Sequence, residues 1–358
     1  MKVRYSPLEE GLRKSLPGGE LAFGALRTNH MFVATYDQGQ WSDPAIVPYG
    51  PFSIMPGAIC LHYGQTIFEG AKCFAHSDGE LHIWRPEKNC ARLNHSASIL
   101  CLPEIPVDLQ MEGILRLIDL ERDWCPKEPE SSLYIRPFMF GVTDTTGVRP
   151  SSQCIFCVFL SPSGPYYKGG FSKALRLLIS TEFHRAVSGG TGSSKCGGNY
   201  AASLRAAAHA SKCGADQVLY LDASNQYIEE VGTMNHYHVL KDGTFIIPEF
   251  NDSILHSITS QSVLDLAARG KIKARTERIA LSAFIAGIKS GDIIEAGGFG
   301  TAAVISPVGA YVLENGETLS VGDGGIGQHS KALYTLYSDM QTGKSPAPEG
   351  WLTRVPRY

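Results

Sequence analysis

The chain has 358 residues, of which 43% are hydrophobic and nine are cysteines. Because this length exceeds the size at which a single hydrophobic core usually stops growing, we expect two domains. Lysine and arginine number 32 against 35 acidic residues, and the net charge of -3 comes without a long run of either sign, which argues against nucleic acid and membrane as partners.

The N-terminal segment lacks the features of a targeting signal. It has no apolar stretch, and the acidic pair Glu9 and Glu10 is atypical of a transit peptide. No apolar run approaches the roughly 20 residues needed to cross a bilayer. The odd cysteine count and scattered spacing favour reduced thiols over a disulfide framework. We therefore expect a soluble, cytoplasmic protein.

The first part of the chain, residues 1–163, combines strands and turns with two helices. The helices are expected near residues 86–99 and 111–124, and the strands at 30–36, 60–63, 132–140 and 154–160. The stretch 161–173, which begins at the end of this part, is dense in Gly, Pro and Ser, which predicts a loop or linker.

The second part mixes helices with hairpins. Helices are expected at residues 200–213, 257–268 and 281–289, and strands at 174–180, 217–221, 234–240 and on either side of 297–301. Because helices do not alternate strictly with strands, the sequence predicts an α+β fold. We expect a small N-terminal domain at 1–163, an interdomain loop at 164–173 and a larger domain at 174–358.

Two groups of residues resemble metal-binding motifs without completing one. Cys154 and Cys157 are three apart in an apolar run that reads as a strand, so their side chains point to opposite faces. His236 and His238 share a strand face, but no third ligand lies near them in the sequence. We therefore expect both pairs to pack in the interior, and we expect no metal.

Two glycine-rich segments resemble nucleotide-binding loops. In the segment 189–200, Ser194 precedes Lys195 and Cys196 follows it, whereas a phosphate-binding loop needs Gly, Lys and then Ser or Thr. The GxGxxG pattern at 322–327 follows a hairpin-like stretch and leaves no room for a βαβ unit. A nucleotide-binding module stays the alternative from a non-enzyme class.

Lys195 is a candidate covalent catalyst. An amine adds to an aldehyde only when it is unprotonated, and a lysine flanked by Gly, Ser and Cys suits that chemistry. From this segment alone, an exposed loop lysine is an equal alternative. The acidic pair Glu229 and Glu230 lies in an apolar strand, where an unpaired acid is costly, so one of them should face a cation. A buried acid also keeps the ring nitrogen of pyridoxal 5'-phosphate (PLP) protonated.

An anion site for a cofactor phosphate has three candidate sources. A helix start at 257–259 would present free N–H groups. Thr301, in a tight glycine turn, offers a hydroxyl and an amide, and Arg92 offers a bidentate charge contact.

Taken together, these segments resemble the branched-chain amino-acid aminotransferases, which are fold-type IV PLP enzymes. The resemblance runs nearly end to end. It is carried by residues 61–74, 132–141, 161–167, 189–204, 230–235 and 300–309. It implies two domains, a small N-terminal α/β domain and a larger PLP-binding domain, and a homodimer.

The resemblance also implies a role for each matching residue. Lys195 matches the Schiff-base lysine and proton shuttle, Tyr200 the phenol at the cofactor's ring oxygen, and Glu230 the acid at the pyridine nitrogen. The phosphate would be held by Arg92, Thr301 and the amides of Ile258 and Thr259. The substrate carboxylate would be held by Tyr63, Thr301 and Ala302. The side-chain pocket would be lined by Phe23, Phe68, Tyr134, Arg136 and Tyr166, and by Thr146 and Val148 from a loop of the neighbouring subunit.

Thr146 stands where leucine is common in the family, and three further features depart from the family pattern. His256 and Ser260 stand in a segment where the family often has proline and arginine, which puts the local support of the phosphate site in question. Ala303 and Ser306 hold the places of a redox CxxC found in some members. Phe299 replaces a commoner small polar residue beside the carboxylate turn.

The function implied is transamination of leucine, isoleucine and valine with 2-oxoglutarate, giving branched 2-oxo acids and L-glutamate. Within the same fold, the alternatives are an aminotransferase for another L-amino acid, a D-amino-acid aminotransferase and an aminodeoxychorismate lyase. The last two groups are usually shorter than this chain.

Overall fold

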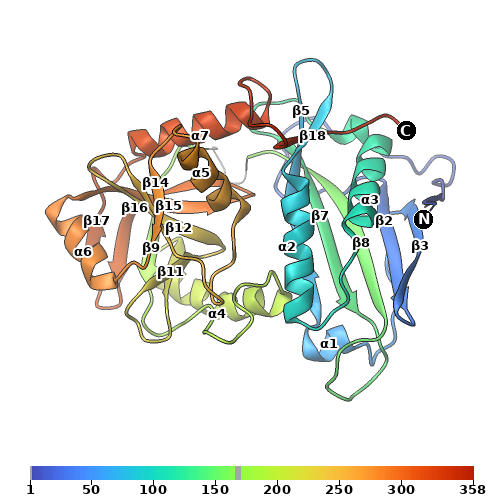
Figure 1. Ribbon diagram of the computed structural model, residues 1–358, viewed down its shortest axis with the longest axis horizontal. Helices are drawn as coiled ribbons and strands as arrows, with labels where there is room; N and C mark the ends of the chain where they lie inside the picture. The colour runs from blue at the N-terminus through green and yellow to red at the C-terminus, as the bar shows by residue number, and fades with distance from the viewer. Residues whose placement is uncertain (1, 166–170) are drawn as a thin grey trace. The chain divides into compact units, whose positions relative to one another are not determined.

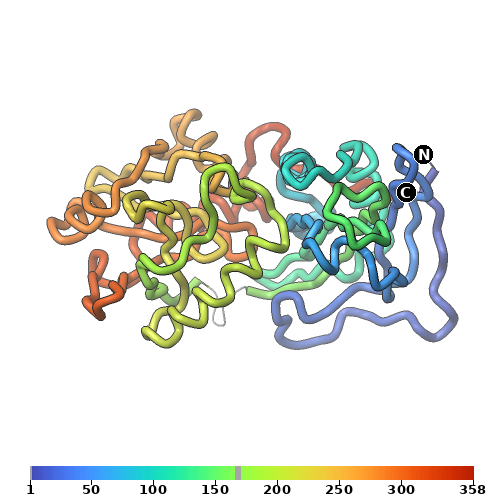
Figure 2. Tube along the Cα trace, turned by 90° about the horizontal axis from the view of Figure 1, so that it is seen from below, coloured from blue at the N-terminus to red at the C-terminus, as the bar shows by residue number. Residues whose placement is uncertain are grey.

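The computed structural model describes residues 2–165 and 171–358, and the chain divides into two compact units (Figure 1). Unit 1 comprises Met1–Lys168, Ser194–Gly197 and Asp339–Tyr358, and unit 2 comprises Gly169–Ser193 and Gly198–Ser338. The first crossing between the units thus falls within the Gly- and Pro-rich stretch. The C-terminal segment returns to unit 1, so both ends of the chain lie there (Figure 2).

Unit 1 is built on one mixed sheet with two helices against it. Its strands run in the order β1-β3-β2-β8-β7-β5-β6-β18, and β4 also pairs with β7. The strands are β1 (Arg4–Tyr5), β2 (His30–Asp37), β3 (Gln40–Pro48), β4 (Thr66–Phe68), β5 (Ala71–Ala75), β6 (Leu81–Trp84), β7 (Ser132–Gly141), β8 (Cys154–Ser163) and β18 (Leu352–Arg354). The helices are α1 (Ile59–Tyr63), α2 (Pro86–Ile99) and α3 (Val107–Leu120), with a 3-10 turn at Arg122–Trp124.

The core of unit 1 lies between this sheet and the helices α2 and α3 (Figure 1). Helix α2 starts with Pro86 at its first position, where proline's missing N–H costs nothing. Its buried residues Cys90, Leu93 and Ala97 follow helical spacing and share one core with Phe156 of the sheet. The predicted helix 86–99 is confirmed in full.

The predicted strand at 60–63 is wrong, because residues 59–63 form the short helix α1. Only Ile59 of this helix is buried, and Gly64 ends it in a left-handed conformation with φ of 64°. A run of four residues is too short for its periodicity to separate a strand from a helical turn. The helix predicted at 111–124 exists, but it begins after Pro106 and ends at Leu120.

Unit 2 contains a sheet whose ends meet. The strand order is β11-β10-β9-β16-β15-β12-β13-β14, with an additional β11–β12 pairing that closes six strands into a ring. Its strands are β9 (Leu175–Ile179), β10 (Gln217–Leu221), β11 (Ile228–Val231), β12 (Met234–Leu240), β13 (Phe245–Pro248), β14 (Ala274–Glu277), β15 (Ile293–Gly300), β16 (Val304–Leu313) and β17 (Thr318–Ser320). Most of these pairs are hairpins, so the α+β arrangement is confirmed.

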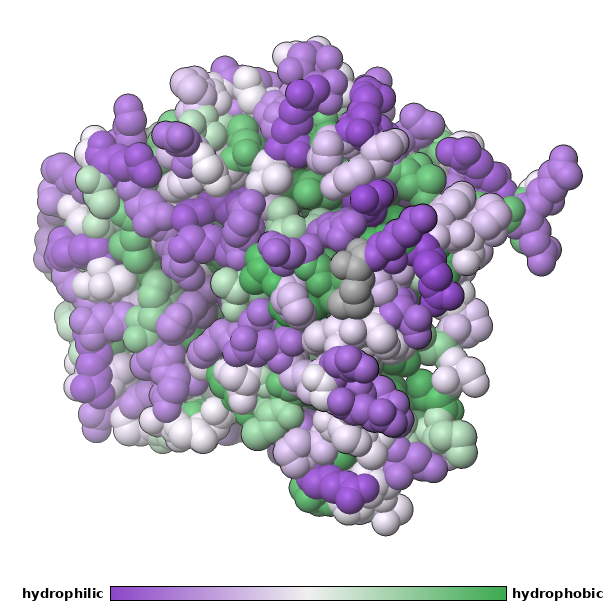
Figure 3. Space-filling view, turned by 45° about the vertical axis from the view of Figure 1, so that its right-hand side comes forward, coloured by the Kyte–Doolittle hydropathy of each residue, from purple (hydrophilic) through white to green (hydrophobic). Residues whose placement is uncertain are grey.

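Four helices accompany this sheet: α4 (Gly197–Lys212), α5 (Ile258–Ala268), α6 (Leu281–Ser290) and α7 (Gln328–Gln341). Helix α4 buries the small residues Ala206 and Ala210 against Leu178 of β9 and Val218 of β10. Small side chains let the helix backbone approach the strands closely. Among the described residues, no helix is long and apolar enough to cross a membrane, and hydrophilic residues cover most of the face shown in Figure 3.

A close approach between α3 and β2 generates a stability prediction. Gly113 is buried in the middle of α3, and a Cβ added there would lie 2.6 Å from the Phe32 ring. In an open helix, Gly→Ala stabilises by about 1 kcal/mol. At this position overpacking, which costs about 1–3 kcal/mol, should dominate. We expect Gly113→Ala to lower the free energy of unfolding, as measured by urea denaturation.

The control is Gly198→Ala in the first turn of α4, where an added Cβ would meet no atom within 4 Å. This substitution should leave the free energy of unfolding unchanged or raise it. Equal effects of the two substitutions would contradict the packing argument.

Candidate active site

Backbone contacts on both sides of Lys195 hold it against β4 in unit 1. Its amide N–H donates to the Ser96 hydroxyl at 2.9 Å, and its carbonyl accepts the Phe68 N–H at 2.9 Å. The next residue, Cys196, forms an isolated antiparallel bridge with Ile67. The lysine therefore extends the edge of the sheet, and the half-buried side chain starts from a fixed backbone. Lys195 is therefore not a fully exposed loop lysine, and its catalytic role stays a prediction.

An aromatic cluster begins beside the lysine side chain in unit 1. The Lys195 Nζ lies 4.8 Å from the centre of the Phe68 ring, and the Arg136 guanidinium lies 4.9 Å from the same ring. Arg136 also donates to the Tyr134 hydroxyl at 3.2 Å, and Tyr134 packs edge-on against Phe23 at 4.9 Å. Four of the predicted pocket residues thus form one continuous cluster with Lys195. The fifth, Tyr166, lies outside the described residues.

A buried ion pair lies next to this cluster. Arg92 donates to both oxygens of Glu69, from Nε at 2.6 Å and from a terminal nitrogen at 3.0 Å, and Asn89 donates to Glu69 at 2.7 Å. Burial alone would raise the pKa of Glu69, but the Arg92 guanidinium, the Lys195 ammonium and Asn89 together lower it below its ordinary value. Glu69 is therefore a fixed anion that orients Arg92 and attracts Lys195.

The loop at 144–148 packs next to α1. The Tyr63 hydroxyl donates to the Thr146 carbonyl at 2.5 Å, and Asp144 bridges to Ala58. Within unit 1, the side chain of Thr146 is exposed and Val148 is 81% exposed. The predicted carboxylate ligand Tyr63 and the predicted pocket residue Thr146 are therefore direct neighbours.

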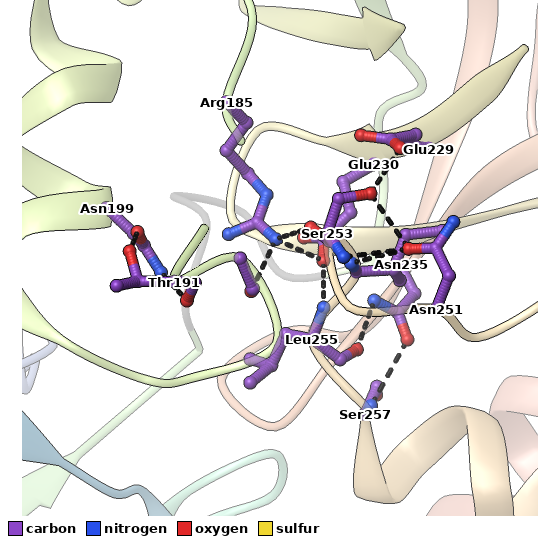
Figure 4. Close-up of polar contacts among 12 residues, drawn as sticks. Arg185, Thr191, Asn199, Glu229, Glu230, Asn235, Asn251, Ser253, Leu255 and Ser257 are labelled. Atoms are coloured by element: carbon purple, nitrogen blue, oxygen red, sulfur yellow. Dashed lines mark hydrogen bonds and ion pairs between the residues drawn. The ribbon is translucent and has the colours of Figure 1, made fainter. Parts of the chain in front are cut away.

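In unit 2, Glu230 lies in β11 and is buried with a cation beside it (Figure 4). One of its oxygens lies 3.0 Å from Arg185 and accepts the Leu255 N–H at 2.6 Å. Both contacts favour the carboxylate form. The prediction that one acid of the pair faces a cation is confirmed for Glu230.

Glu229 has different surroundings. Its Oε1 accepts a short hydrogen bond from the Ser253 hydroxyl, whereas its buried Oε2 has no hydrogen-bond partner among the described residues. Burial is the largest influence on this carboxyl group and raises its pKa. The two neighbouring acids thus differ in their partners: Glu230 has a guanidinium and a backbone N–H, whereas Glu229 has one hydroxyl.

The glycine-rich segment before Lys195 packs against the residues around Glu230, and Arg185 contacts both. Arg185 donates to the carbonyls of Gly192 at 2.8 Å and of Ser253 at 2.6 Å. A Cβ on Gly192 would lie 2.4 Å from the Ser253 carbonyl oxygen, so only glycine fits there. Thr191 and Asn199 exchange two hydrogen bonds, at 2.7 and 2.8 Å (Figure 4).

Tyr200 follows Asn199 in the first turn of α4 and is half-buried. The Tyr200 phenol, five residues after Lys195, is therefore carried by a regular helix. Its predicted contact with a cofactor stays a prediction.

The predicted helix start at 257–259 is confirmed, and Asn235 of β12 supports it. Ser257 is the N-cap of α5, and its hydroxyl accepts the Ser260 N–H at 3.2 Å. Asn235 Oδ1 accepts from the Ser257 N–H at 3.3 Å and from the Ser260 hydroxyl at 3.0 Å, while Nδ2 donates to the Leu255 carbonyl at 2.9 Å. Ser260, which replaces the family's common arginine, thus takes part in the support of the helix start. Leu255 links that start to Glu230 (Figure 4).

The turn that carries Thr301 and Ala302 joins β15 to β16 and is strained. Val304, which follows it, has φ of 63°, a left-handed conformation that is unfavourable for a β-branched residue. Gly298 and Gly300 leave room for the Met234 side chain, which a Cβ at either would approach to 3.0 or 3.1 Å.

Phe299 points away from this turn into the core. It is fully buried and stacks on Tyr237 at 4.3 Å. Phe299, in place of the family's small polar residue, therefore contributes to core packing.

The two pairs that resemble metal-binding motifs pack in the interior, as predicted. Cys154 and Cys157 are buried free thiols in β8. His236 and His238 contact each other at 3.3 Å and pack against Phe284, and burial lowers the pKa of both. The β16–β17 hairpin precedes the GxGxxG turn, so the described residues show no βαβ unit there.

Sequence reasoning missed Glu69, Arg185 and Asn235. Glu69 had a detectable signal, since it is a charge inside the apolar segment of β4 and β5. Arg185 and Asn235 had none, because their partners are far away in the sequence.

Comparison with known proteins places the chain among aminotransferases. The family model for class IV amino-transferases matches residues 66–307. A probable branched-chain-amino-acid aminotransferase of Staphylococcus epidermidis is 42% identical, with 100% of this chain and 99% of the relative covered. Branched-chain-amino-acid transaminase 1 of Bacillus subtilis is also 42% identical, over 94% of each chain.

Solved structures show the same fold. The branched-chain amino acid aminotransferase of Escherichia coli matches with a TM-score of 0.74 and 26% identity, over 91% of this chain and 99% of that one. A second branched-chain amino acid aminotransferase, from T.th. and complexed with N-(5'-phosphopyridoxyl)-L-glutamate, matches with a TM-score of 0.73 and 26% identity, over 90% and 98%. The chain therefore belongs to the class IV aminotransferases, in the family of the branched-chain amino-acid aminotransferases.

Proposed function

We propose that this protein catalyses PLP-dependent transamination of leucine, isoleucine and valine with 2-oxoglutarate. The observation that carries the proposal is Lys195, whose backbone is fixed on the edge of β4 and whose ammonium lies against Phe68 and near the buried anion Glu69. The names of the full-length relatives support the branched-chain substrate.

The residues present fit the cofactor. A lysine amine, a buried carboxylate that can accept the ring N–H and a capped helix start that can donate to a phosphate are the groups that PLP requires. When bound, PLP supplies an electron sink for the substrate's α-carbon. Glu230 would hold the proton on the ring nitrogen, while Tyr200 would donate to the ring oxygen. Arg92, Thr301 and the amides of Ile258 and Thr259 would hold the phosphate.

The chain's own groups would carry out the proton transfer. Lys195 would bind the cofactor covalently, and its amine, once displaced by the substrate, would take the proton from the substrate's α-carbon and deliver it to C4' of the cofactor. Glu69 would keep the lysine and Arg92 in place. Tyr63 and the backbone at Thr301 and Ala302 would hold the substrate carboxylate. After the first 2-oxo acid has left, 2-oxoglutarate would take up the amino group by the same steps in reverse.

We also propose that the protein works as a homodimer. Several large apolar side chains around α1 and the 144–148 loop are exposed, namely Met55, Leu61, Tyr63 and Val148. In the dimer, Thr146 and Val148 would line the neighbouring subunit's side-chain pocket.

Lys195→Ala should abolish transamination while the fold is retained, because the covalent anchor and the proton carrier are lost together. The rival amine is Lys72, which is buried in β5 and whose pKa burial lowers to about 8. Borohydride reduction of the holoenzyme followed by peptide mass spectrometry should find the cofactor on Lys195. Lys72→Met should retain both cofactor and activity. Label on Lys72, or half-reaction turnover in Lys195→Ala comparable to wild type, would refute the assignment.

Glu230→Gln should keep PLP bound but slow the half-reaction on the order of a hundredfold, because a neutral partner no longer holds the ring proton. Glu229→Gln is the matched control and should change the rate little. Stopped-flow absorbance of the cofactor measures both rates, and circular dichroism verifies the fold, since Arg185 loses its buried anionic partner in Glu230→Gln and keeps only its two carbonyl acceptors. The opposite order of effects would mean that Glu229 is the cofactor's partner.

Thr146 generates a prediction about substrate choice. Leucine is common at this family position, and a hydroxyl in its place shortens the apolar wall. Thr146→Leu should improve discrimination for leucine over polar donors by about 1–2 kcal/mol, or about five- to thirtyfold in specificity constants. The Tyr63 contact uses the backbone carbonyl and should survive. Specificity constants for leucine, valine, methionine and polar donors test this, and an unchanged profile would show that Thr146 has no role in selection.

A further inference from the structure

Three metal-ligating side chains converge in unit 2 outside the residues considered so far. His209, Cys213 and Glu314 each offer one ligand atom, and these atoms lie within 4.8 Å of one another. The His209 Nε2 is 3.0 Å from a Glu314 carboxylate oxygen and 3.8 Å from the Cys213 sulfur. An ion pair between His209 and Glu314 and a hydrogen bond between Cys213 and His209 hold the three side chains together.

The fold fixes the backbone of all three residues. His209 lies in the last turn of α4 and Cys213 directly follows the helix, where its N–H still donates to the His209 carbonyl at 3.1 Å, so the two residues lie on the same side of the helix end. Glu314 follows directly after β16, in the tight turn to β17 that the Gly316 N–H closes on the Leu313 carbonyl at 2.8 Å. No loop rearrangement is needed to bring the ligands together.

Packing also orients the side chains. Cys213 packs at the edge of the apolar cluster that joins α4 to β9 and β10. The His209 ring lies 5.4 Å from the Phe183 ring, which limits its rotation. The Arg205 guanidinium lies 5.1 Å from the centre of the same Phe183 ring. His209 and Glu314 keep side-chain exposures of 29% and 23%, so an ion can enter from solvent.

The spacing fits tetrahedral zinc. With bonds of about 2.0–2.1 Å to nitrogen, 2.3 Å to sulfur and 2.0–2.2 Å to oxygen, tetrahedral angles put nitrogen about 3.5 Å from sulfur and about 3.4 Å from oxygen. The observed 3.8 and 3.0 Å differ from these values by a few tenths of an ångström. The third pair, the Cys213 sulfur and the Glu314 oxygen, lies within 4.8 Å, whereas the same bond lengths require about 3.6 Å, so the ligands would have to close in on the ion.

We propose that His209, Cys213 and Glu314 bind one Zn²⁺ ion, with water as the fourth ligand. Imidazole, thiolate and carboxylate together favour zinc over calcium or magnesium, which prefer all-oxygen sites. Binding releases the Cys213 proton, and the thiolate and carboxylate together neutralise the ion. No sequence pattern indicates this site, because Glu314 lies in a hairpin about 100 residues after α4 in the chain.

Such an ion would have a structural role. Helix α4 spans 16 residues, or about 24 Å, with Tyr200 in its first turn and the proposed site at its other end. The metal would tie the end of α4 to the β16–β17 turn, so it should stabilise unit 2 without entering the reaction.

The test titrates the holoenzyme with Co²⁺, a spectroscopic substitute for zinc. The wild type should bind one cobalt per chain with a near-ultraviolet thiolate-to-cobalt band. Cys213→Ser should abolish the band, and Glu314→Gln should weaken binding at least about tenfold. Cys101→Ser is the matched control, because Cys101 is an exposed free cysteine in unit 1, and this variant should bind like the wild type.

A second readout is thermal unfolding with and without Zn²⁺. Zinc should raise the melting temperature of the wild type and of Cys101→Ser but not of Cys213→Ser. Absence of the cobalt band in wild type, or a band that survives in Cys213→Ser, would overturn the proposal. Neither readout depends on aminotransferase activity, so failure here would leave the proposed function intact.

Discussion

Burial of carboxylates is the constraint on which this structure depends. An acid inside a protein needs a cation or hydrogen-bond donors, and in each unit one buried acid meets that need with an arginine. In unit 1, Arg92 binds both oxygens of Glu69. In unit 2, Arg185 and the Leu255 amide hold Glu230. These pairs fix side chains that would otherwise be solvated and mobile, and each pair includes a residue assigned to the reaction.

A second feature of the structure is the route of the backbone around Lys195. Ser194–Gly197 belongs to unit 1, although the chain on either side belongs to unit 2. The bridge to Ile67 and the contacts with Phe68 and Ser96 make the lysine part of a sheet edge. An amine that both anchors a cofactor and moves a proton needs such a fixed origin, since its side chain already has several rotatable bonds. The glycine at 192 permits the preceding loop to lie against Ser253.

The departures from the family pattern have local compensations. Ser260 lacks the arginine's charge, but it joins Asn235 and Ser257 in a hydrogen-bonded helix start. Phe299 adds a large ring, which stacks on Tyr237 inside the sheet. In both cases the new side chain satisfies a packing or hydrogen-bonding need within unit 2. The backbone amides at the start of α5 are preserved.

The sequence by itself determined the α+β class, nearly every long element and the candidate lysine, because periodicity, Pro86 and glycine turns act locally. It failed at residues 60–63, where four residues contain too little periodicity. Local pattern also indicated that one of Glu229 and Glu230 must meet a cation. Only the tertiary structure decided which cation that is, and it also revealed Glu69, Asn235 and the His209 cluster. Those contacts join separate elements of the fold, and hydrogen bonds and ion pairs between distant segments leave no periodic trace in the chain.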